Sequence, residues 1–358
     1  MPALPSTDRL AAGCAGRDGE VAGVAPGAAA GAAALLLGQV REQLAGSIGL
    51  ARKREIGEVV RELGAGFLPL DWPPCFGEDA AAIPRGDGYL LLAADGIRHT
   101  HLVDPFWAGY CSVLVNVNDI VATGGYPLAM VNVVAGGRAD RRKELLTGIA
   151  FGSRHFGVPM IGGHLHPDGE EESVTVAILG TARRLVSSFA ARLGDDLVVA
   201  VDLSGSWHEP FPHWDSTSFR RPGELSAQLS VVPALAESGL VRAGKDISNP
   251  GLLGTLLMLM ESSAVGARVD IDSLPMPAGV ALPRWLESYP GVGFVLAVPP
   301  GCSPAVIAAF EEVDMAARVV GSFAGGSRLV GLSGGSCMEL WDVARQPVMG
   351  VHGAGAKA

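Results

Sequence analysis

Between residues 88 and 184 the sequence alternates between short apolar runs and longer stretches in which apolar residues recur every three or four positions. Short runs rich in Val, Ile and Leu are typical of strands, whereas the three-to-four spacing is typical of helices. This alternation restricts the segment to an α/β domain of about 130 residues, because each helix must cover the sheet formed by its neighbouring strands. Strands are expected at 88–94, 127–136, 158–163 and 173–184, and helices at 105–124 and 140–157.

The pattern restarts at 192–203 and predicts a second α/β domain. Two further helical patterns, at 35–46 and 51–64, precede the first domain's strands. In the second half, helices are expected at 223–238, 251–265 and 303–312, and strands at 268–272, 292–298, 317–323 and 327–332. The chain is therefore expected to divide into an Ala- and Gly-rich disordered leader (1–34), an N-terminal domain (35–186), a C-terminal domain (187–338) and a loosely tied tail (339–358).

The composition is that of a folded acidic protein, with 48% hydrophobic residues, 18% charged residues and a formal net charge of −10. A nucleic acid or an anionic membrane surface requires a basic face, which this charge balance disfavours. No stretch approaches the roughly 18 apolar residues of a membrane-spanning helix. The five cysteines include no C-x-x-C pair, which is typical of a reducing compartment. We expect a cytoplasmic protein that binds a small molecule, without a nucleic-acid or membrane partner.

Acidic residues accumulate in an otherwise apolar segment. Residues 75–133 contain six acids and two basic residues, and Glu78, Asp79, Asp95 and Asp119 lie beside apolar runs. Carboxylates that converge without basic partners repel one another and are costly to bury. Mg²⁺ resolves such clusters, and it also binds phosphate oxygens. The sequence therefore favours a magnesium site, and the alternative is a set of separate surface acids.

The helix at 105–124 carries one polar stripe. Ser112, Asn116, Asp119 and Thr123 are spaced four, three and four residues apart, and the helix contains no Lys or Arg. Residues at this spacing lie on one face of a helix. We interpret the stripe as a wall that faces a ligand, with a subunit interface or a covered helix edge as the alternative.

Two glycines and two histidines follow the strand at 158–163. Gly162 and Gly163 permit close backbone approach to a ligand, and His164 and His166 point the same way if the segment is extended. An H-x-H pair at a strand end can also bind a transition metal, and residues 98–101 ("RHTH") offer a second pair. A zinc or iron hydrolase is therefore the rival chemistry, although no H-E-x-x-H motif accompanies the pairs.

Two segments of the second half are candidates for ligand contacts. Asp246, Ser248 and Asn249 directly precede the apolar helix at 251–265, so this helix start can receive an anion or can simply be capped. The segment 205–220 is rich in aromatic and His residues, contains two prolines and is expected to be neither helix nor strand. We interpret it as a loop that covers a substrate, with a surface excursion as the alternative. The residues that would contact that substrate are His208, His213, Trp214, Asp215 and Arg220.

The sequence contains neither a G-x-x-x-x-G-K-[ST] loop nor a strand-linked G-x-G-x-x-G motif, so a nucleotide would have to be held by other means. Five other motifs resemble one superfamily, which comprises aminoimidazole ribonucleotide (AIR) synthase, thiamine-monophosphate kinase, selenophosphate synthetase and a hydrogenase-maturation dehydratase. The resemblance covers about residues 48–335 and is closest to an uncharacterised subgroup related to AIR synthase. The motifs are "GEDAAAI" (77–83), "LLLAADGI" (90–97), "VNDIVATGGYPL" (117–128), "IGGHLHPD" (161–168) and "DISNPGL" (246–252).

The resemblance implies a two-domain fold of the PurM type, in which the N-terminal sheets of two subunits form a β-barrel and the C-terminal domain is an α/β sandwich. It implies ATP in a groove between barrel and second domain, with Mg²⁺ between its phosphates and several acids. It also implies transfer of the γ-phosphoryl group to an oxygen or selenide of a small substrate, which depends mainly on positioning and charge neutralisation. The motifs and the resemblance together lead us to expect metal binding by Glu78, Asp79, Asp95 and Asp119, catalysis by Asp79, Asp119 and His164, and cofactor binding by Asn118, Gly162, Gly163, Asp246 and Ser248. Substrate contact is expected from His166, His208, His213 and Asp215, on the residues alone, because the loop at 207–215 matches none of the characterised branches of the superfamily.

The chain also departs from the family pattern. Glu78 stands where relatives usually carry Asp, and His164 and Asn249 each replace an Asp of the thiamine-phosphate kinases. The catalytic Cys and Lys of selenophosphate synthetases are not found, since Cys14 lies in the wrong kind of segment and Lys53 is the only candidate lysine in that region. We expect a Mg²⁺- and ATP-dependent phosphotransferase or ATP-driven synthase. The alternatives are thiamine-monophosphate kinase or AIR synthase proper, and a non-catalytic nucleotide-binding assembly protein.

Overall fold

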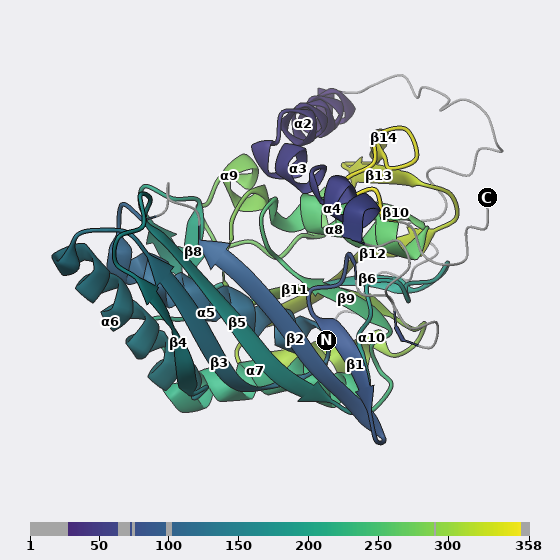
Figure 1. Cartoon of the computed structure of the whole chain (residues 1–358). Coiled ribbons are helices and arrows are strands. Elements are labelled where there is room, and N and C mark those ends of the chain that lie inside the picture. The colour runs from purple at the N-terminus through teal and green to yellow at the C-terminus, as the bar shows by residue number, and fades with distance from the viewer. Residues whose placement is uncertain (1–27, 64–71, 74–75, 98–101, 290, 352–358) are drawn as a thin grey trace.

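The computed structural model describes residues 28–63, 72–73, 76–97, 102–289 and 291–351. Within them, two large sheets with helices on their faces form an α/β architecture (Figure 1). The expected two-domain α/β fold is therefore confirmed. The division at 186/187 stays a prediction, and the segment that it crosses, 183–195, joins the two sheets. No helix of the described residues is long and apolar enough to span a membrane.

The first sheet has the strand order β1-β2-β5-β3-β4, and only β3 and β4 run parallel. The four strands predicted from the sequence of this domain are β2, β3, β4 and β5. Strand β1 was not predicted, because its five residues include a proline and are too few to show a period. The strands are β1 (Ala81–Arg85), β2 (Gly88–Ile97), β3 (Tyr126–Ala135), β4 (Met160–His166) and β5 (Ser173–Ala182).

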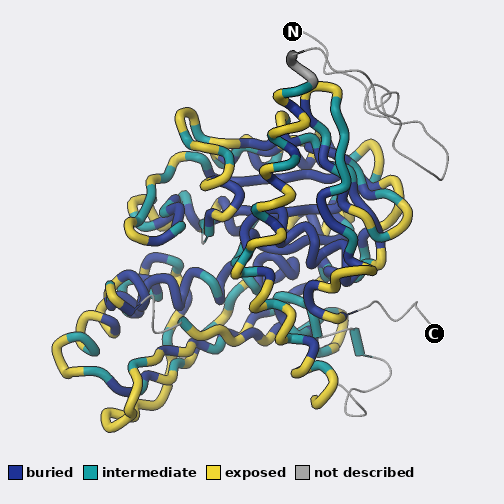
Figure 2. Tube along the Cα trace, turned by 90° about the horizontal axis from the view of Figure 1, so that it is seen from above, coloured by how far each residue is buried: buried dark blue, intermediate teal, exposed yellow. Residues whose placement is uncertain are grey.

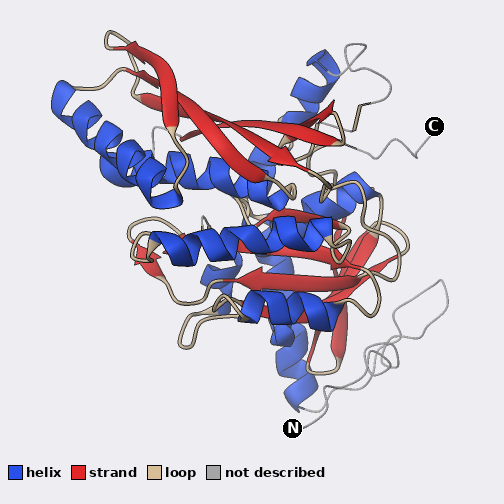
Figure 3. Cartoon of the chain, turned by 90° about the horizontal axis from the view of Figure 1, so that it is seen from below, coloured by secondary structure: helices blue, strands red, loops and turns tan. Residues whose placement is uncertain are grey.

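Helices α5 (Pro105–Ala122) and α6 (Ala139–Phe156) cover one face of this sheet (Figure 3). Helix α5 begins where the sequence predicts, because the Asp104 carboxylate accepts the Trp107 N–H at 2.9 Å. Glycine lets the two helices approach closely: a Cβ at Gly109 would lie 2.1 Å from the Leu145 carbonyl oxygen. Helix α5 is consequently buried along most of its length.

The second sheet has the order β14-β13-β10-β12-β6-β11-β9. Its central strands β6 and β11 are continuous apolar runs, because both of their faces are covered. The short polar strand β9 and the strand β14 were not expected from the sequence. The strands are β6 (Asp196–Val201), β9 (Ala243–Asp246), β10 (Gly266–Asp270), β11 (Gly293–Val298), β12 (Ala316–Ala324), β13 (Arg328–Ser333) and β14 (Ser336–Asp342).

Helices cover both faces of the second sheet. Leu229 of α7 and Val306 of α10 belong to the same core as Val198 and Phe294, whereas Leu37 of α2 belongs to the core on the opposite face. The helices of this half are α2 (Ala28–Ala45), α3 (Ile48–Lys53), α4 (Ile56–Leu63), α7 (Pro222–Glu237), α8 (Gly251–Ser263), η2 (Ile271–Ser273), α9 (Leu282–Leu286) and α10 (Ser303–Glu311).

The two ends of the described chain differ from the expectation. Residues 28–34, expected in a disordered leader, form the start of α2, because Ala-rich segments favour helix; residues 1–27 lie outside the described part. Helix α2 packs on β13 and β14 of the second sheet, not on the first domain. The expected loose tail contains β14 and the buried residues Val348 and Met349.

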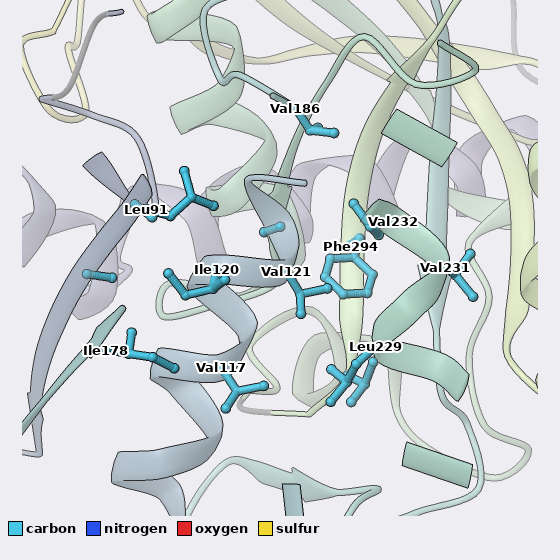
Figure 4. Close-up of a cluster of buried hydrophobic side chains, with 14 of the residues drawn as sticks. Leu91, Val117, Ile120, Val121, Ile178, Val186, Leu229, Val231, Val232 and Phe294 are labelled. Carbon is cyan, nitrogen blue, oxygen red and sulfur yellow. The ribbon is translucent and has the colours of Figure 1, made fainter. Parts of the chain in front are cut away.

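One hydrophobic core connects the two sheets (Figure 4). Leu91 and Ile178 extend into it from the first sheet, Ile120 from α5, and Leu229 and Phe294 from the second domain. Buried residues are found in both domains (Figure 2). Because α5 contributes to this shared core, the helix is held in a fixed position relative to the second sheet.

Candidate functional site

A cavity of about 390 Å³ lies between the two domains. Its walls come from the loop before β1, the end of β2, helix α5, strand β9 and the residues that precede α8. Segments far apart in the sequence therefore meet here. The charged residues that line the cavity are Glu78, Asp79, Asp95, Asp119, Asp246, Lys53 and Lys245, and the others include Ser248, Asn249, Tyr289 and Met349.

Asp119 and Asp246 face the cavity from opposite domains. Burial raises the pKa of Asp119 well above its ordinary value, and repulsion from Asp246, Asp79 and Asp95 raises it further. Burial, followed by repulsion from Asp79, raises the pKa of Asp246 to about 8. Neither carboxylate accepts a hydrogen bond that is recorded among the described residues. Both carboxylates would therefore be stabilised by a cation in the cavity.

For Asp79, a side chain of the protein itself provides the stabilising cation. Its carboxylate forms an ion pair with the Lys245 ammonium group, and its other oxygen lies 3.4 Å from the Asp246 backbone N–H. Burial lowers the pKa of Lys245, but attraction to Asp79, Glu78 and Asp246 outweighs burial and leaves the pKa above its ordinary value. Lys245 stands in the "GKDISNPG" segment, where sequence reasoning considered only its neighbours.

Glu78 and Asp95 contribute differently. Both Glu78 oxygens are engaged by the chain after β5, one by the Ser187 hydroxyl and the other by the Ser188 N–H at 2.8 Å. Burial nevertheless raises the pKa of Glu78. Asp95 accepts the Gly96 N–H at 2.7 Å, and loss of surrounding water raises its pKa. Glu78 thus fastens the loop before β1 to the segment 183–195 that joins the two sheets, and Asp95 keeps an oxygen without a recorded protein partner.

The carboxylates surround the cavity without converging on one point. Within the described part of the chain, no three His, Cys, Asp or Glu side chains lie close enough to hold a metal ion by themselves. Mg²⁺ is commonly held by one or two carboxylates and completes its octahedron with water and phosphate oxygens. The donors fit such an ion bound together with a phosphate, because Asp119 and Asp246 are carboxylates whose charge no recorded hydrogen bond offsets.

The polar stripe of α5 is not a ligand-facing wall. The side chains of Ser112, Asn116 and Thr123 donate to carbonyl oxygens of their own helix at 2.7, 2.8 and 2.9 Å. Of the stripe, only Asp119 lines the cavity, together with Val115 one turn earlier. The interpretation was wrong for the other three because the donor groups of a buried Ser, Asn or Thr can bond to a carbonyl of the preceding turn.

Asn118 and the glycine–histidine segment lie outside this cavity. Asn118 is buried and donates to the Gly291 carbonyl at 2.8 Å. Gly163 allows β4 to pack on β3, because a Cβ would lie 2.4 Å from the Asn132 oxygen. His164 and His166 are exposed on β4 with ring centres 6.4 Å apart, so they do share a side of the strand. Gly162 lies beside Val131, and the second H-x-H pair at 98–101 lies outside the described residues.

The segment 205–220 has regular structure, contrary to the expectation. Strands β7 (Ser206–His208) and β8 (His213–Asp215) form a small hairpin. His208 stacks on Trp107 and bonds to Asp104 at 3.1 Å, and the Trp107 indole N–H lies 2.9 Å from His213 Nδ1. These contacts attach the hairpin to the start of α5. Asp215 accepts the Thr217 and Ser218 N–H groups and turns the chain after β8.

Several of the residues that line the cavity were not predicted from the sequence. Lys53 comes from α3, which lies against Asn249, since a Cβ at Gly49 would be 2.3 Å from that side chain. Tyr289 and Met349 add an aromatic ring and a thioether. From the sequence, Lys53 was considered only as the one candidate for the lysine of selenophosphate synthetases. The other two carry no local signal, because only the packing of the second domain places them at the cavity.

Comparison with known protein families gives a match to each of the two domains that line the cavity. Residues 77–182 match the model described as AIR synthase related protein, N-terminal domain, and residues 212–332 match its C-terminal domain. Together these ranges cover more than half of the chain. The chain belongs to the AIR synthase related family. The first match begins at Gly77, in the loop that carries Glu78 and Asp79, and the second contains Lys245 and Asp246.

Relatives and solved structures agree with the AIR synthase related family. A Synechocystis protein described as uncharacterised is 38% identical over 279 residues, which are 77% of this chain and 87% of the relative. Thermotoga maritima PurL complexed with ATP aligns with TM-score 0.67 at 19% identity, over 78% of this chain and 47% of PurL. AaThiL complexed with AMPPCP and TMP aligns with TM-score 0.59 at 19% identity, over 78% of this chain and 92% of ThiL. The chain thus spans about half the length of PurL, and these structures share its PurM-like fold.

Proposed function

We propose that this chain is a Mg²⁺- and ATP-dependent phosphotransferase, or an ATP-driven synthase, that acts on a small metabolite. The observation that carries the proposal is that Asp95, Asp119 and Asp246, from both domains, line one cavity. Their charges repel one another, and the pKa values of all three are raised. A polyphosphate with its divalent cation brings the positive charge that such a cavity requires.

The cation would be held by Asp119 and Asp246, with Asp95 as a third acid on the same cavity. Bound Mg²⁺ would supply charge neutralisation of the phosphoryl group under transfer. The protein's own part is positional: α5 is fixed in the shared core, and β9 is fixed by its pairing with β11. Transfer between two bound substrates gains most of its rate from such fixed geometry.

The nucleotide phosphates would contact Lys53, Ser248 and Asn249. Ser248 and Asn249 line the cavity directly before α8, and the start of a helix favours anions. Lys53 forms no recorded ion pair among the described residues, so its ammonium group is available to a phosphate. The ATP and AMPPCP complexes of PurL and ThiL, which share the fold, support a nucleotide here. The roles predicted for His164, His166, His208, His213, Asp215, Asn118, Gly162 and Gly163 gain no support from this cavity.

We also propose that two copies of the chain associate through the first sheet. Leu92, Val131, Val133 and Leu179 are 48%, 41%, 41% and 37% exposed, on the neighbouring strands β2, β5 and β3. Leu92 pairs directly with Leu179 across the sheet. A row of exposed aliphatic side chains on adjacent strands is typical of a protein–protein interface.

The test is calorimetric titration of ATP with and without Mg²⁺. Wild-type protein should bind ATP only with Mg²⁺, and ligand at 100 times its dissociation constant should stabilise the fold by about 2.7 kcal/mol. Asp119→Asn should weaken binding at least about tenfold, which corresponds to about 1.4 kcal/mol. Asp140→Asn is the matched control, because Asp140 lies on α6, is 61% exposed and pairs with Arg138.

Turnover separates catalysis from binding. With a pool of small metabolites, wild-type protein should release ADP, and Asp119→Asn should not. Tight nucleotide binding without turnover against any pool would instead favour the assembly-protein alternative. Absence of ATP uptake by folded protein in the presence of Mg²⁺ would refute both.

A further inference from the structure

The buried Lys245 ammonium group has a full set of acceptors. Lys245 is 3% exposed and donates to the Asp79 carboxylate, to the Gly77 carbonyl at 2.9 Å and to the Ser188 hydroxyl at 3.2 Å. An ammonium group has three N–H donors, so none remains for a ligand. Lys245 therefore lines the cavity without being able to bind a phosphate in this arrangement.

Asp79 is correspondingly occupied on both oxygens. One accepts from Lys245, and the other is within 3.4 Å of the Asp246 N–H. Its side chain is 12% exposed. Asp119 and Asp246 line the same cavity, and no hydrogen bond to either carboxylate is recorded within the described ranges. Of these three carboxylates, one is neutralised by the protein and two are not.

The ion pair also joins the two domains. Asp79 precedes β1 of the first sheet and Lys245 lies in β9 of the second, 166 positions later. Glu78 reinforces the same contact through Ser187 and Ser188. A metal ion between the domains would give the same neutralisation, but only when bound. Lys245 gives it permanently.

We propose that Lys245 is a built-in countercharge that takes the place of a second divalent cation. It reserves Asp79 as its own partner, so that the cavity binds one divalent cation, on the side of Asp119 and Asp246. Lys245 is a positioning residue, because it acts on Asp79 and the loop before β1 and does not touch the reacting groups. This inference rests on the proposed cation site, and it concerns which acids that site uses.

The experiment measures the thermal shift that Mn²⁺ causes in the presence of inorganic pyrophosphate, relative to pyrophosphate alone, because the cation is expected to bind together with a phosphate. Wild-type protein should gain Tm with Mn²⁺, and Asp119→Asn should lose that gain. Asp79→Asn should keep the wild-type gain within about 1 °C, because Asp79 is not a cation ligand. Lys245→Met should show a larger gain than wild type by several degrees, because Asp79 is then free to bind a second Mn²⁺.

The double variant Asp79→Asn/Lys245→Met is the control for misfolding of the two single variants. Asp79→Asn and Lys245→Met each leave one buried group without its partner and should each lower the Tm of the metal-free protein by roughly 5–10 °C. The double variant leaves neither group unpaired, so its Tm should fall by less than the sum. It should show the wild-type Mn²⁺ shift even if either single variant fails to fold.

Two outcomes would overturn the inference: loss of the Mn²⁺ shift in the double variant, or an unchanged shift in a folded Lys245→Met. Electron paramagnetic resonance provides the count, with one bound Mn²⁺ per wild-type chain and two in Lys245→Met. Two Mn²⁺ ions in the wild type would also contradict the proposal. A Mn²⁺ site that appears only in Lys245→Met would support the role of Lys245 and refute the proposed function.

Discussion

At the scale of single residues, the carboxylate of Asp202 is held by three neighbouring residues and Asp202 is 1% exposed. Arg220 donates to both of its oxygens at 2.6 and 2.8 Å, and Ser204 and Gln228 add further hydrogen bonds. Burial raises the pKa of Asp202, but the bonds from Arg220, Ser204 and Gln228 outweigh burial and hold the pKa below its ordinary value. The pair therefore stabilises the fold only where Asp202 is ionised.

Removal of Arg220 tests this pair. Arg220→Ala should lower the free energy of unfolding at pH 7 by about 3–5 kcal/mol, because the Asp202 carboxylate is left buried without a cation. A lowered pKa contributes stability above the ordinary value of about 3.9 that is lost as pH falls, so the difference should shrink below pH 4. Urea unfolding at pH 7 and pH 3.5 measures it. The neighbouring exposed Arg221, paired with Glu224, is the control, and Arg221→Ala should cost less than about 1 kcal/mol.

Asp246 gives the opposite dependence on pH. Its pKa is raised from 3.8 to about 8, so the folded state retains a proton that the unfolded state has lost. This contribution is fully present below pH 4 and is lost as pH rises towards 8. Asp246→Asn should therefore be more stable than wild type at pH 8.5, by at least about 1 kcal/mol in the free energy of unfolding, and so should unfold at a higher temperature. At pH 4 the two proteins should unfold at the same temperature. Thermal melts in EDTA measure the effect, and identical melts at pH 8.5 would contradict it.

At the scale of elements, the end of the described chain is attached to α8 through one carboxylate. Glu261 is 1% exposed and accepts the N–H groups of Val348, Met349 and Gly350 at 3.0, 2.7 and 2.9 Å. Met349 also lines the acidic cavity. Glu261 thus holds part of the cavity wall in place although it does not itself line the cavity.

Replacement of this carboxylate should release the segment. Glu261→Gln loses the charge and turns an acceptor into a donor that faces backbone N–H groups, so we expect a loss of about 2–4 kcal/mol in the free energy of unfolding. Amide exchange of residues 348–350 should accelerate by more than that of β14. Glu311→Gln, on the exposed face of α10, should change stability by less than about 0.5 kcal/mol. Unchanged exchange at 348–350 would show that other contacts hold the segment.

At the scale of the whole molecule, the exposed face of the first sheet predicts association. Replacement of both Leu92 and Leu179 by Lys places like charges at directly paired positions and should convert a dimer into a monomer. Light scattering after gel filtration measures the mass. Leu193→Lys is the control, because Leu193 is 72% exposed in the loop before β6 and should not alter the mass. A monomeric wild type would refute the proposed association.

The sequence by itself determined the order and type of most elements. Helix α5 and the strands β2, β3, β5, β6 and β11 were predicted because their signals are local: an Asp–Pro start, a three-to-four spacing or a continuous apolar run. It also determined which acids could share a site, because the five family motifs each occupy a short stretch. The strands β1, β9 and β14 were not predicted, since four to seven residues with polar members show no period.

Only the tertiary structure decided which partners those residues meet. The countercharge of Asp79 lies 166 positions away, and no local pattern relates the two. Whether Ser112 and Asn116 faced a ligand or their own helix depended on what packs against α5, and the attachment of residues 348–350 depended on Glu261. Local preferences are set by neighbours along the chain, whereas burial, charge pairing and cavity walls arise from segments that meet only after folding.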